Sequence, residues 1–204
     1  MEKTKALNVP NALSLLRVIL VPVFMAAVLL TARAEVGDTW LETFANRAIP
    51  ALVFGLTAFT DMLDGKIARK YNLITDFGKF IDPLADKFMV FGALIAILVA
   101  YPEISSVFVW VAMIVMLREL AITSLRLVIA GNSGKVLAAS WWGKVKTVTQ
   151  TAAILLIILE PAIWQPAFCP HLISYASMAL MAIATVGSGV DYMRAYIPLI
   201  DMNK

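Results

Sequence analysis

The sequence has little charge and almost no cysteine. Only 15% of its 204 residues are Asp, Glu, Lys or Arg, whereas 61% are hydrophobic. A soluble domain has roughly a quarter of its residues charged, so this composition argues against an ordinary soluble globular protein. The single cysteine excludes an internal disulfide and disfavours a metal–thiolate site. A membrane protein is the class that remains.

Apolar segments dominate the chain. The mean hydropathy is +0.83, and six apolar segments approach the roughly 20 residues that cross a bilayer as a helix. We therefore predict an all-α fold, a bundle of six transmembrane helices in one domain over residues 1–204. The predicted spans are 11–30, 49–70, 80–100, 107–130, 147–159 and 172–190. The first is expected to stay uncleaved, because its apolar run continues past the core of a signal peptide without a clear cleavage site.

The basic residues are distributed unequally across the predicted membrane. Six spans put both termini on one side, and that side receives fifteen of the seventeen Lys and Arg residues. The opposite side has only Arg33 and Arg47. Basic residues favour the cytoplasmic side of a membrane protein. We therefore expect a multi-pass protein of the inner (cytoplasmic) membrane with both termini in the cytoplasm.

The acidic residues gather in one stretch. Residues 61–86 contain five of the fourteen acids, although apolar segments flank the stretch. Asp61 and Asp64 lie one helical turn apart on the second span, and Asp82 and Asp86 lie one turn apart on the third. A short loop joins these spans, so the four carboxylates are expected to converge near the cytoplasmic surface. Ionisable groups close to membrane depth are costly and indicate a functional site.

Such a cluster of carboxylates predicts a metal site. Its members would repel one another, and a divalent cation relieves the repulsion. Oxygen ligands suit Mg²⁺, Mn²⁺ or Ca²⁺, and two metals that share carboxylates can support phosphoryl displacement. Gly65 and Ala68 would let a ligand approach the helix backbone, and Arg69 can bind a phosphate. Close packing between membrane helices would explain the small residues equally well.

The spacing of these residues forms a signature. It reads Asp61-x2-Asp64-Gly65-x2-Ala68-Arg69-x8-Gly78-x3-Asp82-x3-Asp86. With all fixed positions present, it resembles the signature of the CDP-alcohol phosphotransferase family. The resemblance extends to residues 8–24, to Arg118–Glu119 and to residues 124–131 and 141–153. These further segments are similar to family members that use glycerol 3-phosphate as the acceptor.

The resemblance implies both a reaction and roles for residues. A homodimer in the lipid bilayer would transfer a phosphatidyl group from CDP-diacylglycerol to glycerol 3-phosphate with one or two Mg²⁺ or Mn²⁺ ions. No nucleic-acid partner is expected. Asp86 would also be the general base. The implied metal ligands are Asp61, Asp64, Asp82 and Asp86. The implied contacts with the CDP-lipid are Asn11, Gly65, Ala68, Arg69, Thr75 and Gly78, with a loop or helix-cap role equally open for Asn11 and Thr75.

The acceptor's phosphate would need cationic side chains. Arg118 and Arg126 lie eight residues apart on similar faces of the fourth span, and Lys144 and Lys146 follow in a basic segment. We predict that these four residues bind the phosphate. Two alternatives stay open: Arg118 could pair with Glu119, and the lysines could anchor the chain at the membrane surface.

The alternatives are another acceptor and another class of membrane protein. The same chemistry could serve inositol phosphate, serine or another alcohol. An ion-coupled transporter would place acids in mid-membrane and would show discontinuous helices and an inverted repeat. Here the acids lie at predicted cytoplasmic ends, and the sequence shows no convincing repeat. Arg17, inside the first span, is interpreted either as an arginine that snorkels to the membrane surface or as a phosphate contact.

Overall fold

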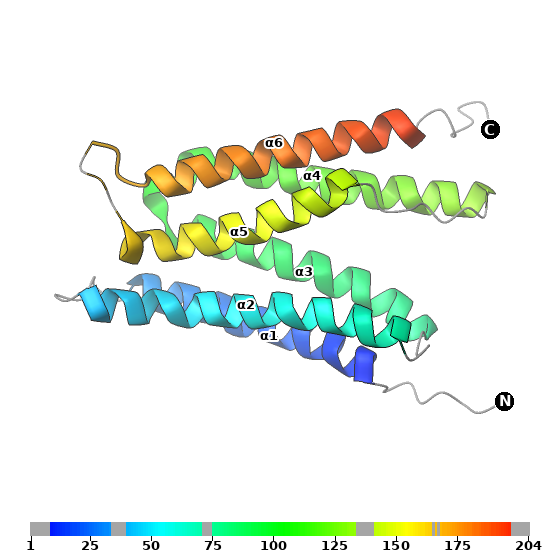
Figure 1. The fold of residues 1–204 in the computed structure, drawn as a ribbon, viewed down its shortest axis with the longest axis horizontal. Helices are drawn as coiled ribbons and strands as arrows, with labels where there is room; N and C mark the ends of the chain where they lie inside the picture. Colours follow the sequence, from blue (N-terminus) through cyan, green and yellow to red (C-terminus); the bar gives the residue numbers. More distant parts are fainter. Residues whose placement is uncertain are drawn as a thin grey trace. The chain divides into compact units, whose positions relative to one another are not determined.

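The computed structural model describes residues 9–33, 40–70, 75–133, 141–164, 166 and 168–196. Within these residues there is no strand, and the regular structure is six α-helices (Figure 1). The all-α prediction is confirmed. The helices are α1 (Val9–Arg33), α2 (Trp40–Lys70), α3 (Asp76–Ala100), α4 (Pro102–Ser133), α5 (Trp141–Ile163) and α6 (Leu172–Tyr196).

Five of the six helices begin earlier than predicted, α1 at Val9 and α4 at Pro102 among them. Helix α2 begins at Trp40 and α5 at Trp141, within segments that were assigned to a linker and an interface loop. The first residues of these two helices include no proline and no pair of glycines, so no residue there stops a helix. Asp76, assigned to a loop, is the first residue of α3. Thr75 caps this helix, because its hydroxyl accepts the backbone N–H of Gly78 at 3.0 Å.

Five of the helices are long and apolar enough to cross a membrane, which makes the chain a multi-pass membrane protein. Their candidate spans are Val9–Ala32, Phe80–Ala100, Pro102–Ile129, Trp141–Ile163 and Leu172–Tyr196. Helix α2 is not among them. Only residues 48–60 separate Arg47 from Asp61, about 20 Å of helix against a hydrocarbon core of about 30 Å. The sixth span therefore stays a prediction.

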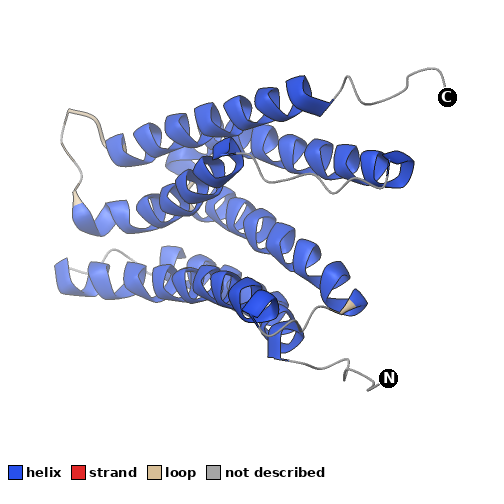
Figure 2. Ribbon diagram, turned by 45° about the vertical axis from the view of Figure 1, so that its right-hand side comes forward, coloured by secondary structure: helices blue, strands red, loops and turns tan. Residues whose placement is uncertain are grey.

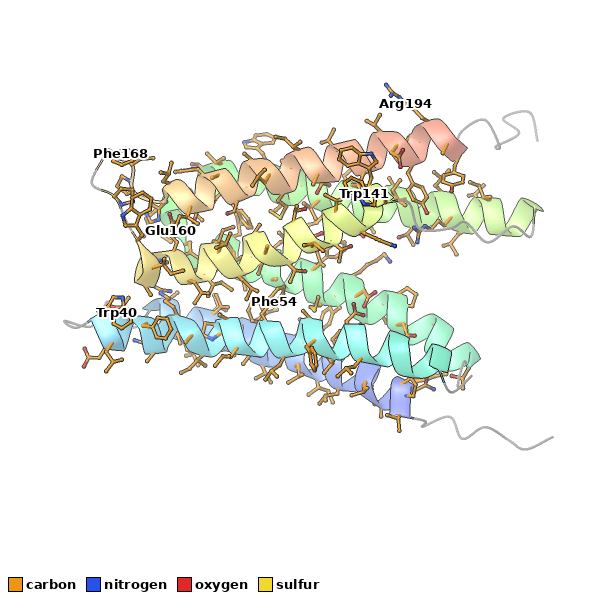
Figure 3. All side chains as sticks on the ribbon, viewed as in Figure 1. Trp40, Phe54, Trp141, Glu160, Phe168 and Arg194 are labelled. Carbon is orange, nitrogen blue, oxygen red and sulfur yellow. The ribbon has the colours of Figure 1, made fainter. Side chains whose placement is uncertain are left out.

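The fold divides into two compact units. The first contains α1, α2, α3 and the C-terminal end of α5, and the second contains α4 from Ile104, α5 as far as Ile157, and α6. In the first unit α1 packs against both α2 and α3, and α1 and α2 run side by side in opposite directions (Figures 1 and 2). The ring of Phe54, labelled in Figure 3, lies 5.2 Å from that of Phe24.

A glycine lets α3 approach α1 closely. A Cβ atom at Gly92 would lie 2.6 Å from Cγ1 of Val21, which is closer than real side chains come. Gly92 is therefore required by this contact rather than by a turn. Close approach of this kind is a usual means of packing helices in membranes, where dispersion contacts replace the hydrophobic effect.

A polar contact joins α2 to the C-terminal end of α3, the end that is remote from the acidic residues. The buried Arg47 donates from Nη1 to the Tyr101 hydroxyl at 3.1 Å, and its guanidinium lies 5.2 Å from the Tyr101 ring centre. Burial raises the pKa of the Tyr101 phenol, and the charge of Arg47 opposes this in part. The hydroxyl is therefore neutral at physiological pH.

The second unit has a small apolar cluster and a polar helix face. Ile122, Leu125 and Ile129 of α4 pack with Tyr192 of α6. Helix α6 also buries hydroxyl-bearing side chains, among them Thr185 and Ser188. Small polar residues on a buried face allow helices to pack closely and to exchange hydrogen bonds.

Candidate functional site

Three of the four predicted metal-binding aspartates have described side chains, and all three contact α1. Nη1 of Arg17 lies 2.8 Å from Oδ1 of Asp61, and the same nitrogen donates to Oδ1 of Asp86. The carboxylates of Asp61 on α2 and Asp86 on α3 are therefore close to each other, because both contact the same nitrogen. The hydroxyl of Ser14 donates to Oδ1 of Asp82 at 2.5 Å. The structure therefore brings Asp61 and Asp86 together and ties Asp82 to the same helix.

Arg17 meets these carboxylates from the protein interior. Its side chain is 0% exposed, whereas those of Asp61 and Asp86 are 41% and 51% exposed. The interpretation of Arg17 as a snorkelling residue is therefore wrong, because a snorkelling side chain keeps its charged end in water. A charged group inside a membrane protein is stabilised instead by an opposite charge. The accessible surface of the two carboxylates remains open to ions and substrates.

Three polar residues of α1 form what we call the α1 polar stripe: Asn11, Ser14 and Arg17. All three are buried, and their spacing of three residues places them along one side of the helix. Asn11 donates from Nδ2 to the Thr75 hydroxyl at 2.8 Å. The stripe thus contacts the cap of α3 and the carboxylates of both acidic helices. It is the common support of the described part of the signature.

Gly78 provides the space for one of these contacts. A Cβ atom at this position would lie 2.7 Å from Oδ1 of Asn11 and 3.2 Å from Oγ1 of Thr75. Asn11 and Thr75 therefore act as a cap and as a link between α1 and α3. Gly78 was predicted to contact the CDP-lipid, and in this structure the amide of Asn11 lies against it.

The remaining signature residues lie near the C-terminal end of α2. The side chains of Asp64, Gly65, Ala68 and Arg69 are outside the described residues. Among the side chains that the structure does describe, no three His, Cys, Asp or Glu residues are grouped closely enough to hold a metal ion. That set omits Asp64. The donor chemistry nevertheless fits Mg²⁺ or Mn²⁺, since carboxylate oxygens that are partly exposed are the ligands these ions prefer.

The second unit contains a cluster of charges around Glu119. Its Oε1 atom accepts a hydrogen bond from the ammonium of Lys146 and lies 3.3 Å from Nη1 of Arg118. Arg118 also donates from Nη2 to the Ser188 hydroxyl at 2.5 Å. Helices α4, α5 and α6 are therefore joined at one point. The pairing of Arg118 with Glu119, which the sequence left open, is present.

The other predicted acceptor-binding cations are placed differently. Arg126 donates from Nε and Nη2 to the hydroxyl of Tyr192, at 3.0 and 2.5 Å, and its guanidinium lies 4.9 Å from that ring's centre. Lys144 is exposed on the first turn of α5 and makes no hydrogen bond or ion pair with the part of the chain that the structure describes. The structure thus brings Lys146 and Arg118 together at Glu119 and leaves Lys144 on the surface.

Several polar atoms of this unit are buried without a hydrogen-bond partner among the described residues: Nε of Arg118, Nε2 of Gln150 and Oγ1 of Thr185. Buried polar atoms are nearly always hydrogen-bonded, by protein, water or ligand. Gln150 follows Lys146 by one turn of α5, and Thr185 precedes Ser188 by one turn of α6. Gln150 and Thr185, whose polar atoms have no partner among the described residues, therefore lie on the same helix faces as Lys146 and Ser188.

Comparison with known proteins decides the family. Residues 7–189 match the family model of the CDP-alcohol phosphatidyltransferases. The chain belongs to this family. A CDP-diacylglycerol–glycerol-3-phosphate 3-phosphatidyltransferase from Bacillus subtilis is 40% identical over 91% of this chain and 93% of the relative. A protein of the same name from Escherichia coli K12 is 36% identical over 92% and 94%. A probable phosphatidylglycerophosphate synthase from Mycobacterium tuberculosis is 34% identical over 94% and 82%.

In this CDP-alcohol phosphatidyltransferase, the residues that support the charged groups were not predicted from the sequence. Ser14 was not singled out, although three polar residues spaced by three on an apolar helix indicate a buried polar side. Ser188 and Tyr192 also recur at nearly helical spacing on α6. The spacing of Ser188 and Tyr192 does not predict which cation each contacts, because Arg118 and Arg126 lie on a different helix, α4.

Proposed function

We propose that the chain transfers the phosphatidyl group of CDP-diacylglycerol to the C1 hydroxyl of sn-glycerol 3-phosphate. The products are phosphatidylglycerol phosphate and CMP. The observation that carries this proposal is the gathering of Asp61, Asp82 and Asp86 on the α1 polar stripe. The choice of acceptor is supported by relatives that are named for this reaction.

Asp86 is proposed as the general base. The acceptor oxygen attacks the phosphorus that bears diacylglycerol, and a new P–O bond forms as the P–O bond to CMP breaks. The hydroxyl proton passes to the Asp86 carboxylate, which is 51% exposed and so within reach of a soluble acceptor. Arg17 contacts the same carboxylate from the interior and fixes its orientation.

The proposed metal ligands are Asp61, Asp64, Asp82 and Asp86, for one or two Mg²⁺ or Mn²⁺ ions. When bound, such an ion neutralises the pyrophosphate and stabilises CMP as the leaving group. Within the described residues, α1 holds three of these carboxylates by direct hydrogen bonds or ion pairs. Their positions are therefore set before any substrate arrives, and this favours catalysis by reducing reorganisation.

The proposed contacts with the CDP-lipid surround the acidic residues in the sequence: Asn11, Gly65, Ala68, Arg69, Thr75 and Gly78. Arg69 would hold a phosphate, and the small residues would let the nucleotide approach the helix backbone. The acyl chains would stay among the exposed apolar side chains of the helices, such as Leu15 and Leu84. The head group alone would then need to reach the acids.

The proposed binding residues for the acceptor's phosphate are Arg118, Arg126, Lys144 and Lys146. The Nε of Arg118 has no hydrogen-bond partner among the described residues, and this supports the role, because a phosphate oxygen could accept its hydrogen. Inositol phosphate would need the same cations, so it is the alternative acceptor that the experiment must separate. The family match and the transferase names disfavour an ion-coupled transporter.

The proposed topology follows the positive-inside pattern. We propose that α2 is the sixth crossing helix, that both termini and the acidic residues face the cytoplasm, and that the protein resides in the inner membrane. We further propose that residues 1–204 act as one catalytic domain and that the chain functions as a homodimer, as the family resemblance implies.

The test is the release of CMP by the purified full-length protein. With CDP-diacylglycerol and Mg²⁺ or Mn²⁺, we expect CMP only when glycerol 3-phosphate is added. Parallel reactions contain inositol phosphate or serine in its place. Release with either of these, and none with glycerol 3-phosphate, would refute the acceptor assignment while leaving the family chemistry intact.

A further inference from the structure

Arg17 is a buried cation in direct contact with two acidic residues of the signature. Its Nη1 atom lies between Asp61 and Asp86, and its side chain has no exposed surface. Burying a guanidinium is costly unless anions compensate it. The carboxylates need the cation for the same reason, because like charges at short distance destabilise each other. Each side of this contact thus neutralises the other.

We propose that Arg17 is a built-in counter-cation of the acidic site, which holds Asp61 and Asp86 together when no divalent ion is bound and lowers the affinity of the site for that ion. The inference rests on the proposed function, since it takes these aspartates as metal ligands. It assigns Arg17 a role beyond binding the substrate: Arg17 sets how tightly the ion is held.

The expected direction of the effect follows from charge. A divalent ion that binds Asp61 and Asp86 comes within a few ångströms of the guanidinium, and the two cations repel each other in a partly buried setting where screening is weak. The ion must also share oxygen atoms that already accept hydrogen bonds from Arg17. Loss of the guanidinium therefore removes a penalty on metal binding. It also removes the ion pairs that Arg17 makes with the metal-free carboxylates, which destabilises the metal-free protein.

A protein without Arg17 would thus depend on metal for its stability, whereas the natural chain would not. This arrangement favours exchange: a site that keeps its geometry without the ion can release the ion together with the product and bind another. Arg17 is a positioning residue in this scheme, because it acts on the ligands and not on the reacting atoms.

Arg17→Gln tests the proposal on the full-length protein in detergent, near neutral pH. Mn²⁺ binding is measured by electron paramagnetic resonance, and the unfolding temperature is measured in EDTA and in Mn²⁺. We expect Mn²⁺ to bind about tenfold or more tightly to the variant, from the lost charge repulsion. We also expect a lower unfolding temperature in EDTA and a larger rise on adding Mn²⁺ than in the natural protein.

A matched control is Arg47→Gln, which removes another buried arginine of the same unit, one that contacts Tyr101 and not the acids of the signature. It should lower the unfolding temperature equally in EDTA and in Mn²⁺ and leave the Mn²⁺ Kd unchanged. Arg17→Lys keeps the charge without the planar fork, so its Mn²⁺ Kd should stay within about threefold of the natural value while its stability in EDTA falls.

The outcomes are distinguishable. Unchanged or weaker Mn²⁺ binding in Arg17→Gln overturns the counter-cation role, because the guanidinium would then be neutral toward the ion or would help to bind it. If Arg17→Gln cannot be purified, Arg17→Lys decides: an unfolding temperature in EDTA equal to that of the natural protein, or an Mn²⁺ Kd changed by more than about threefold, overturns the proposal. If the natural protein itself binds no Mn²⁺, the proposed metal site fails, whatever the variants show.

Discussion

The hydroxyl of Ser14 lies 2.5 Å from Oδ1 of Asp82, so a residue of α1 fixes a carboxylate of α3. The two residues are 68 positions apart in the sequence. A hydrogen bond to a charged group contributes roughly 1.5–3 kcal/mol, more than one between neutral partners. The contact is therefore strong enough to decide the orientation of Asp82.

Replacing Ser14 by Ala should lower turnover. The substitution removes the donor to Asp82 and keeps the helix, since alanine is the best helix former. We expect the rate of CMP release to fall about 3- to 30-fold, with a small loss of stability. Ser14→Thr retains a hydroxyl and should keep most of the activity. Full activity in Ser14→Ala would show that Asp82 needs no support from α1.

Replacing Asp86 by Asn should abolish turnover and leave the fold intact. The amide cannot accept the proton of the acceptor hydroxyl, and proton transfer typically accounts for about 10²–10⁴ in rate. The side chain is half exposed, so the substitution opens no cavity. CMP release and thermal unfolding are measured together. Glu103→Gln, which neutralises an exposed acid at the start of α4, should remain active.

Replacing Gly78 by Ala should destabilise the protein and weaken binding of CDP-diacylglycerol. The new Cβ atom would lie 2.7 Å from Oδ1 of Asn11, so the amide must move and the link from α1 to Thr75 is lost. Overpacking of this kind costs about 1–3 kcal/mol. Gly55→Ala is the matched control, because no atom beyond its chain neighbours and the nearby backbone of its own helix lies within 4 Å of its new Cβ. It should be neutral or slightly stabilising, and similar losses in both variants would argue against this role for Gly78.

Replacing Tyr192 by Phe should raise the KM for glycerol 3-phosphate. The hydroxyl of Tyr192 is the acceptor for Nε and Nη2 of Arg126, and without it the guanidinium loses its fixed position. A rise of about 3- to 10-fold is expected, the value of one ordinary hydrogen bond. The KM for CDP-diacylglycerol should not change. Tyr196→Phe, a variant at the neighbouring ring 4.8 Å away, serves as the control. Equal rises for both substrates would remove Arg126 from the acceptor site.

Removal of divalent ions should stop the reaction reversibly. EDTA is expected to abolish CMP release, and excess Mg²⁺ or Mn²⁺ should restore it, because four carboxylates with Arg17 but no divalent ion keep a net negative charge and would repel the pyrophosphate. The measurement is a metal titration after dialysis. Undiminished turnover in EDTA, in protein shown to be free of bound metal, would contradict the proposed metal ligands.

The sequence predicted the helices well and their contacts poorly. Apolar segments of suitable length located all six helices, since such segments are readable from their own residues. The start of α2 at Trp40 was missed, because the segment before residue 49 is polar enough to resemble a linker. Its partner also lies elsewhere: Trp40 donates its indole N–H to the carbonyl of Ala162 at 2.7 Å, 122 positions later.

The candidate site was predictable where spacing alone carries information. The signature residues follow a fixed pattern in the sequence, so their identity was available before the structure. The role of Arg17 was not, because the choice between lipid, water and carboxylate partners depends on how α1 faces α2 and α3. The partner of Arg118 was likewise undecided from the sequence, and in the structure Arg118 pairs with the adjacent Glu119.

The α1 polar stripe has a consequence for identifying active members of the family from their gene sequences. The acidic signature lies entirely between residues 61 and 86, while the side chains that support its described carboxylates come from residues 14 and 17. A related gene could therefore keep every signature residue and still encode a protein whose acids are unsupported. Such a pseudoenzyme would pass a search for the signature. Examining the first helix as well would reveal it.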